Sequence, residues 1–213
     1  VREILNSVSL TIDDLVIHTP QKLAEEATVV QTIVNLKSDR EIACQIFSHD
    51  KETDQWHLHV SAAIGVLAAQ PGAIKVLTLQ ARLKDNLSVD EHYQRLADRG
   101  LSFGAAFHGM TGLWMGKNEA LARIEGPESV VEETSNYHLH PALLDAALQA
   151  VTPLLPQGNK TYLPMTVETV KAFNSLGSTL WSHASIKTDK PQNNGILTAD
   201  INLYDDNGQL VVA

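Results

Sequence analysis

The chain has 213 residues, of which 44% are hydrophobic and 19% are charged, so one large or two small globular domains fit it and a disordered chain does not. A net charge of −9 argues against nucleic acid as a partner. No apolar run is long enough to span a membrane, the N-terminal segment lacks a signal-peptide pattern, and a single cysteine, Cys44, excludes an internal disulfide. These features favour a cytoplasmic protein without a membrane segment.

Antiparallel strands joined by short turns are predicted for the first third of the chain. Val and Thr are frequent in residues 26–36, and apolar residues alternate with polar ones in 40–48 and 56–67. Polar turns at 37–39 and 48–54 separate these segments. The pattern predicts three consecutive antiparallel strands, whereas residues 68–85 give the weakest signal.

A short helix and a further strand region are predicted next. Ser88 is a suitable N-cap, Glu91 follows three residues later, and Gly100 is a suitable C-terminal stop, which together predict a helix over residues 88–100. Residues 113–124 return to a strand pattern with a turn near Asn118.

An apolar helix over about residues 139–155 is the most distinctive predicted element. Pro141 suits its first turn, Ala, Leu or Val occupy nearly every later position, and Pro153 predicts its end or a kink. Strand-like segments follow at 162–170, 179–188, 196–204 and 209–213, with a hairpin turn at 205–208. A buried helix followed by antiparallel strands predicts an α+β fold in which a curved sheet wraps around a helix.

Asp145 is the strongest candidate for a catalytic residue, because it lies in the middle of this apolar helix. An unpaired carboxylate is costly to bury, so such a side chain is neutral, is hydrogen-bonded or faces a cavity. Gln149 follows four residues later on the same helix face, where it can hydrogen-bond Asp145 or a ligand. A general acid and a buried structural carboxylate both fit this pattern.

The segment HPALLDAALQ, residues 140–149, closely resembles the second-half catalytic motif of dehydratase domains from modular type I polyketide synthases. Three further segments are similar to family elements in the same order: 56–65, 100–109 (GLSFGAAFHG) and 162–170 (YLPMTVETV). The resemblance implies a double hot-dog fold. Residues 1–85 would form the C-terminal part of an incomplete first hot-dog plus a linker, and residues 86–213 would form the second hot-dog.

The same resemblance implies the removal of water from a 3-hydroxyacyl chain on an acyl carrier protein, giving a 2,3-enoyl thioester in polyketide synthesis. Asp145 matches the family's general acid, and Gln149 would hold that carboxyl group or the substrate. The implied substrate-binding residues are Phe103, Gly104, Phe107, His140, Leu163 and Pro164. The resemblance implies neither a metal nor a nicotinamide, since an acid and a base carry out the reaction. The carrier delivers the substrate on its phosphopantetheine arm.

The chain departs from the family pattern at the catalytic histidine, which lies in an H-x-x-x-G-x-x-x-x-P motif that these residues do not contain. The resemblance therefore places that histidine outside the chain. Phe103 and Ala105 replace the family's Tyr and Pro, and packing in a core is the favoured interpretation for Phe103 and Phe107. His57 and His59 are expected at a surface or interdomain position, and a solvated position is expected for four others: His18, His49, His92 and His183. A metal site of His57, His59, His138 and His140 lacks supporting ligands.

Two other functions remain open: a non-catalytic module that scaffolds the synthase or docks the carrier, and an isomerase or oxygen-ring cyclase that uses the same acid and base. The expected partners are the acyl carrier protein and neighbouring synthase domains, and a homodimer stays open. Arg95, Arg99 and Lys117 are candidates for a basic patch toward an acidic carrier. Without its central helix, the N-terminal sheet is expected to expose an apolar face that favours association.

Overall fold

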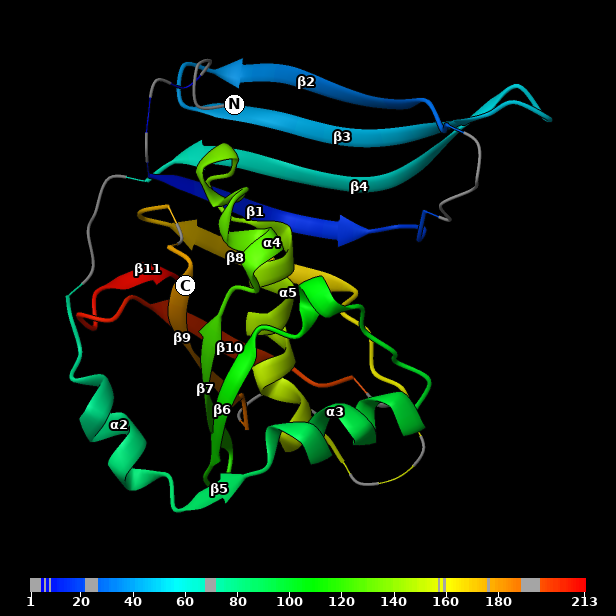
Figure 1. The fold of residues 1–213 in the computed structure, drawn as a ribbon. Coiled ribbons are helices and arrows are strands. Elements are labelled where there is room, and N and C mark those ends of the chain that lie inside the picture. Colours follow the sequence, from blue (N-terminus) through cyan, green and yellow to red (C-terminus); the bar gives the residue numbers. More distant parts are fainter. Residues whose placement is uncertain are drawn as a thin grey trace. The chain divides into compact units, whose positions relative to one another are not determined.

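The computed structural model of the chain forms two compact units (Figure 1). It describes residues 5, 7, 9–21, 27–67, 72–156, 158, 160–175, 177–188 and 196–213. The first unit comprises residues 1–69 and 162–173, and the second unit comprises residues 70–161 and 174–213. Strands in both units pair antiparallel, and the helices whose bounds are described belong to the second unit. The predicted α+β class with antiparallel sheets is confirmed. Among the described residues, no helix is long and apolar enough to cross a membrane.

The first unit contains a five-stranded antiparallel sheet with the strand order β2-β3-β4-β1-β8. The three consecutive strands predicted from the alternating pattern are β2, β3 and β4. The strands of this unit are β1 (Leu10–Ile17), β2 (Val30–Ser38), β3 (Glu41–Asp50), β4 (Gln55–Val66) and β8 (Thr166–Ala172).

The two units contain different residues from the predicted parts, 1–85 and 86–213, because strand β8 belongs to the first unit. β8 comes from the second half of the chain, yet it pairs with β1 along its whole length, from Leu10 opposite Ala172 to Val16 opposite Thr166. The first unit therefore includes a segment that follows most of the second unit in sequence. A pairing between strands so distant in sequence leaves no local pattern, because each strand shows only its own alternation.

One face of the first unit's sheet is apolar. Ile42 and Ile64 are paired on β3 and β4 and are buried together with Leu5 and Leu10. On the edge strand β2, however, Val30, Val34 and Leu36 are 49%, 36% and 62% exposed. The sheet therefore does not expose a whole apolar face as expected, because Ile42 and Ile64 are buried; the exposed apolar side chains are on β2.

The second unit contains a six-stranded antiparallel sheet in the order β11-β10-β9-β7-β6-β5. The predicted turn at residues 205–208 joins β10 to β11, and Gly208 in this turn has a φ of +78°, which glycine adopts without strain. The strands of this unit are β5 (Asp85–Leu87), β6 (Met110–Met115), β7 (Glu119–Glu125), β9 (Thr179–Ile186), β10 (Ala199–Tyr204) and β11 (Leu210–Val212).

The helix predicted over residues 88–100 is α3. The Ser88 hydroxyl accepts a hydrogen bond from the Glu91 amide at 3.3 Å, and Gly100 after the last turn has a φ of +84°, as the capping pattern predicts. Helix α2, in contrast, was not predicted. The helical segments are α2 (Val76–Arg82), α3 (Val89–Asp98), η1 (Ala105–Phe107), α4 (Glu128–Val131), η2 (Thr134–Asn136), α5 (Pro141–Leu148) and η3 (Gln149–Leu154).

The predicted apolar helix begins at Pro141 as expected but ends as an α-helix at Leu148, and it continues to Leu154 as the 3₁₀ segment η3. Pro153 explains the change, because it has no amide proton to donate to the carbonyl of Gln149, four residues earlier. The Thr152 hydroxyl donates to that carbonyl instead, at 2.8 Å. The predicted α-helix over 139–155 was therefore too long.

Helix α5 packs against the sheet of the second unit, in contact with β7, β9 and β10. The buried Ser182 hydroxyl on β9 donates to the Ala147 carbonyl at 2.8 Å and anchors the helix to the sheet. Ala142, Leu143, Ala146 and Ala147 form the buried face, whereas Asp145 is only partly buried. The prediction of a helix buried all round is wrong, but a sheet folded around one helix is the hot-dog arrangement expected.

Candidate active site

Asp145 and Gln149 are joined by the hydrogen bond that their spacing predicts. Nε2 of Gln149 donates to Oδ2 of Asp145 at 2.8 Å. Gln149 lies one helical turn after Asp145, where it is the C-cap of α5 and the first residue of η3. Its side chain is buried, with 4% exposure. A partly exposed carboxyl group is thus held from one side by a buried amide.

The carbonyl oxygen of Phe107 is a second anchor for the same amide. Nε2 of Gln149 lies 3.4 Å from this oxygen, and the Tyr93 hydroxyl donates to it, also at 3.4 Å. The Tyr93 hydroxyl in turn accepts from the Met110 amide at 3.3 Å. Gly109 lets the chain between Phe107 and Met110 pass close to β7 and α5, because a Cβ there would lie only 3.3 Å from the Glu125 carbonyl oxygen and 3.5 Å from Cβ of Ala146.

Helix α3 contributes two adjacent aromatic side chains to this region. Burial raises the pKa of the Tyr93 hydroxyl, and the negative charge of Asp145 raises it further. The Tyr93 ring stacks on His108 with a centroid distance of 4.2 Å. Burial, aided by the charge of Arg95, lowers the pKa of His92 to about 4, so this ring is neutral near pH 7.

The hydrogen bonds around Thr152 determine the tautomer of His92. Nε2 of His92 lies 3.3 Å from the Thr152 hydroxyl, whose proton is already directed to the Gln149 carbonyl. His92 must therefore carry its proton on Nε2 and donate it to Thr152. Neither Tyr93 nor His92 was a candidate from the sequence, since their partners lie in later segments and leave no local pattern.

Three of the predicted substrate-binding residues lie near this hydrogen-bonded group. Phe103 packs edge-on against Tyr93 with a centroid distance of 6.4 Å. Gly104 begins η1, which contacts α5, and Phe107 ends it. The Phe107 side chain is 38% exposed, so packing in a core, the interpretation favoured from the sequence, does not describe it.

Of the other three predicted substrate-binding residues, one caps α5 and two belong to the first unit. His140 caps α5, since its Nδ1 accepts from the Ala142 amide at 3.2 Å, and its buried Nε2 lies 4.0 Å from the Glu133 carboxylate. Leu163 and Pro164 precede β8 in the first unit and are exposed. Their participation in the site of Asp145 remains a prediction.

Two histidines expected at the surface are buried instead. His59 on β4 bonds the Ser48 hydroxyl through Nε2 at 2.7 Å and the Thr19 carbonyl through Nδ1 at 2.8 Å. His92 is buried as described above, whereas His57 is exposed as expected. Within the described ranges, no group of three or more His, Cys, Asp or Glu side chains is arranged to hold a metal ion.

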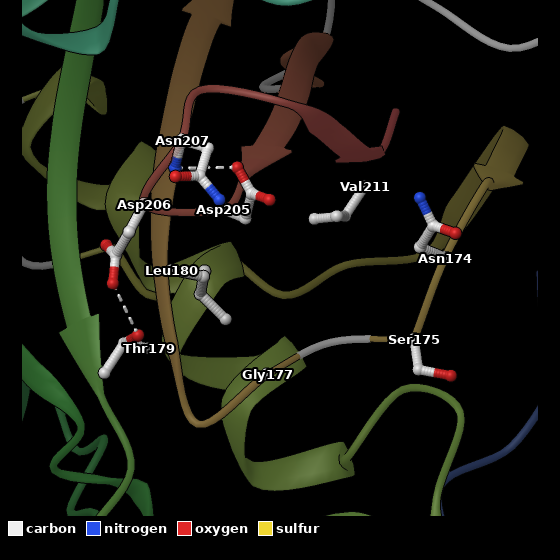
Figure 2. Close-up of a pocket in the computed structure, with 9 residues that line it drawn as sticks. All are labelled: Asn174, Ser175, Gly177, Thr179, Leu180, Asp205, Asp206, Asn207 and Val211. Atoms are coloured by element: carbon white, nitrogen blue, oxygen red, sulfur yellow. Dashed lines mark hydrogen bonds between the residues drawn. The ribbon is translucent and has the colours of Figure 1, made fainter.

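A polar pocket of about 400 Å³ lies beside the β10–β11 turn of the second unit (Figure 2). Asp205 and Asp206 line it together with Asn174 and Thr179. Both carboxylates have partners, since Oδ1 of Asp205 accepts from the Asn207 and Gln209 amides, and Asp206 pairs with Arg123 and accepts from Thr179. These contacts stabilise the turn, and neither Asp145 nor Gln149 lines this pocket.

Comparison with known proteins assigns the chain to a family. A family model described as the polyketide synthase dehydratase N-terminal domain matches residues 75–213. The polyketide synthase PksN of Bacillus subtilis is 28% identical over 201 residues, which cover 90% of this chain and 4% of PksN. Mycoketide-CoA synthase of Mycobacterium tuberculosis is 31% identical over 142 residues, which cover 66% of this chain and 3% of that protein. The chain thus spans a small part of these relatives.

Solved structures agree with this assignment. The dehydratase domain from the CurF module of curacin polyketide synthase is 33% identical with a TM-score of 0.84, covering 96% of this chain and 72% of that chain. An inactive aspartate-to-asparagine mutant of the CurK dehydratase is 27% identical with a TM-score of 0.87, covering 96% of this chain and 73% of that chain. The chain therefore belongs to the polyketide synthase dehydratases, a family of hydro-lyases.

Proposed function

We propose that this chain contributes the general acid to the dehydration of a 3-hydroxyacyl thioester, giving a 2,3-enoyl thioester during polyketide synthesis. The observation that carries the proposal is the hydrogen bond from Gln149 to Oδ2 of Asp145. Because an amide N–H can only donate, Oδ2 is occupied as an acceptor, and the transferable proton of the carboxyl group belongs on Oδ1.

The reaction needs an acid because hydroxide is a poor leaving group. A base removes the proton from the α-carbon, and the electron pair of that C–H bond becomes the new carbon–carbon double bond. The C–O bond at the β-carbon breaks, and the oxygen leaves as water with the proton from Asp145. The base would be a histidine contributed from outside these 213 residues.

Inactive mutants of similar proteins support these two roles. An aspartate-to-asparagine mutant and a histidine-to-phenylalanine mutant of the CurK dehydratase are both described as inactive. Both proteins are similar to this chain over 96% of its length. Asp145 is the carboxylic acid of this chain whose position in the helix motif and whose amide partner suit the acid role.

The surroundings of the site are part of the same proposal. Phe103, Gly104 and Phe107 would line the acyl chain, His140 would hold the start of α5, and Leu163 with Pro164 would complete the tunnel wall. The substrate would arrive on the phosphopantetheine arm of an acyl carrier protein, without a metal or nicotinamide. The proposed partners are the acyl carrier protein and neighbouring synthase domains, and the proposed location is cytoplasmic.

The test is incubation of the chain, extended by a histidine-bearing upstream segment, with a 3-hydroxyacyl group on a carrier protein, followed by mass spectrometry of the acyl arm. Loss of one water with formation of a 2,3-double bond is expected. A double bond at another position would indicate an isomerase, and retention of mass with a new ring would indicate a cyclase. An unchanged substrate, with a histidine-bearing upstream segment present, would contradict the proposal and favour a scaffold.

A further inference from the structure

The hydroxyl group of Tyr93 lies between two backbone groups, the Phe107 carbonyl at the end of η1 and the Met110 amide at the start of β6. It accepts from the Met110 amide at 3.3 Å and lies 3.4 Å from the Phe107 carbonyl oxygen. An amide N–H can only donate, so the hydroxyl must accept there, and its own proton is left for the carbonyl. The direction of both hydrogen bonds is thereby determined.

The Phe107 carbonyl connects Tyr93 to the acid. It receives Nε2 of Gln149 as well as the Tyr93 hydroxyl, and the same Nε2 holds Oδ2 of Asp145. The segment that carries this carbonyl is a 3₁₀ turn of three residues, which has no side-chain cap of its own. Tyr93 comes from the ten-residue helix α3, which has a bonded N-cap and a glycine stop.

We infer that Tyr93 is a positioning residue for the general acid: it orients the Phe107 carbonyl, which holds the Gln149 amide against Asp145. This inference rests on the proposed function, since it concerns the same acid. Tyr93 is not assigned contact with the substrate.

The surroundings of Tyr93 keep its hydroxyl a donor. Burial and the Asp145 carboxylate raise the pKa of the phenol, so it stays protonated at neutral and mildly alkaline pH. The ring is held between Phe103, at a centroid distance of 6.4 Å, and the stacked His108, at 4.2 Å. Its orientation is thus restricted by packing as well as by hydrogen bonds.

The neighbouring residue on α3 holds the backbone of Gln149. His92 donates from Nε2 to Thr152, whose hydroxyl donates to the Gln149 carbonyl. Helix α3 is therefore connected to Gln149 in two ways. His92 is linked through Thr152 to the Gln149 carbonyl group, and Tyr93 is linked through the Phe107 carbonyl to the Gln149 side-chain amide. This double connection distinguishes α3 from an ordinary packing helix.

Tyr93→Phe tests the inference, because it removes the hydroxyl and keeps the ring. Tyr204→Phe is the matched control, since Tyr204 is a buried tyrosine on β10 of the same unit that belongs to a separate core cluster with Leu121 and Val76. In the chain extended by the histidine-bearing upstream segment, Tyr93→Phe should lower kcat roughly 10-fold with little change in KM, the size expected for one lost hydrogen bond. Tyr204→Phe should retain kcat.

A double-mutant cycle shows whether Tyr93 acts through Gln149. In a Gln149→Met background, Tyr93→Phe should have little further effect on kcat. An equal loss in both backgrounds, or an unchanged kcat in Tyr93→Phe, would overturn the inference.

A readout without turnover separates this inference from the proposed function. In ¹⁵N–¹H spectra, the side-chain amide signals of Gln149, assigned by their loss in Gln149→Met, should shift in Tyr93→Phe and stay unchanged in Tyr204→Phe. Unchanged signals in Tyr93→Phe would reject the positioning role even if the chain is an active dehydratase. Shifted signals in a chain without dehydratase activity would retain the contact and reject the proposed function.

Discussion

The side-chain amide of Gln149 can be oriented in one way only. Its two partners, the Asp145 carboxylate and the Phe107 carbonyl, are both acceptors, so the nitrogen must face them. The amide oxygen Oε1 is consequently turned to a buried position, where it has no hydrogen-bond partner within the described parts of the chain. A buried acceptor without a partner costs about 1–3 kcal/mol. The hydrogen bond from Gln149 to Asp145 is thus retained at some cost in the free energy of unfolding, as is common at functional sites.

His92 should make the stability of the second unit sensitive to acid. Its pKa is about 4 in the folded chain, below the ordinary value of 6.5, because burial disfavours the charged ring. The unfolded chain therefore binds this proton first as the pH falls, and the stabilisation present above pH 6.5 is lost toward pH 4. The free energy of unfolding should fall by about 2 kcal/mol more between pH 7 and pH 5 than in a variant without this histidine.

Urea unfolding of the unmodified chain and of His92→Gln at both pH values measures this difference. Gln can still donate to Thr152, so the variant keeps that contact and loses the titration. Equal pH dependence of the two proteins would show that His92 does not titrate as described.

At the scale of elements, the junction between α5 and η3 brings the acid and its holder together. Pro153 leaves the Gln149 carbonyl without its α-helical donor, and Thr152 supplies the replacement while accepting from His92. The helix tightens at the residue that contacts Asp145, which is Gln149. The end of α5 is thus determined by a local sequence feature, Thr-Pro, together with a contact from α3.

Thr152→Val should destabilise this junction. The substitution keeps the shape of the side chain but leaves the Gln149 carbonyl and the Nε2 proton of His92 without this hydroxyl. A loss of about 1–2 kcal/mol in the free energy of unfolding is expected. Thr152→Ser keeps the hydroxyl and should recover most of that loss in the same denaturant titration; equal stability of the Val and Ser variants would argue against the role of the hydroxyl.

The edge strand β2 should limit the solubility of the chain. Val34 and Leu36 are exposed on the same face of a strand that pairs only with β3 among the described residues. Exposed apolar side chains on a sheet edge favour association. Val34→Lys with Leu36→Lys should therefore reduce self-association in sedimentation velocity experiments.

A control for the added charge is available on the same strand. Asn35 lies between the two apolar residues and faces the opposite side of the sheet. Asn35→Lys should change association less than the double substitution does. A chain that is already monodisperse at high concentration would contradict the expectation.

At the scale of the whole molecule, the sequence predicted the elements whose signals are local. Ser88 and Gly100 correctly predicted the two ends of α3, and the alternation in residues 40–48 correctly predicted β3. The spacing of Asp145 and Gln149 gave their hydrogen bond. Contacts between distant segments were not predictable in this way. β8 pairs with β1, and Tyr93 contacts the last residue of η1, but none of these segments carries a sequence pattern that identifies its partner.

The central claim is that Asp145 supplies the proton that leaves with the hydroxyl group. Asp145→Asn keeps the size of the side chain and an oxygen for Gln149, but it cannot transfer that proton. Asp39→Asn, in the exposed β2–β3 turn, is a control for the loss of one carboxylate. The most direct measurement is the rate of enoyl formation from a 3-hydroxyacyl carrier substrate, with the histidine-bearing upstream segment present in every variant. Asp145→Asn should lower this rate by at least about 100-fold and Asp39→Asn should not, whereas unchanged turnover in Asp145→Asn would contradict the account.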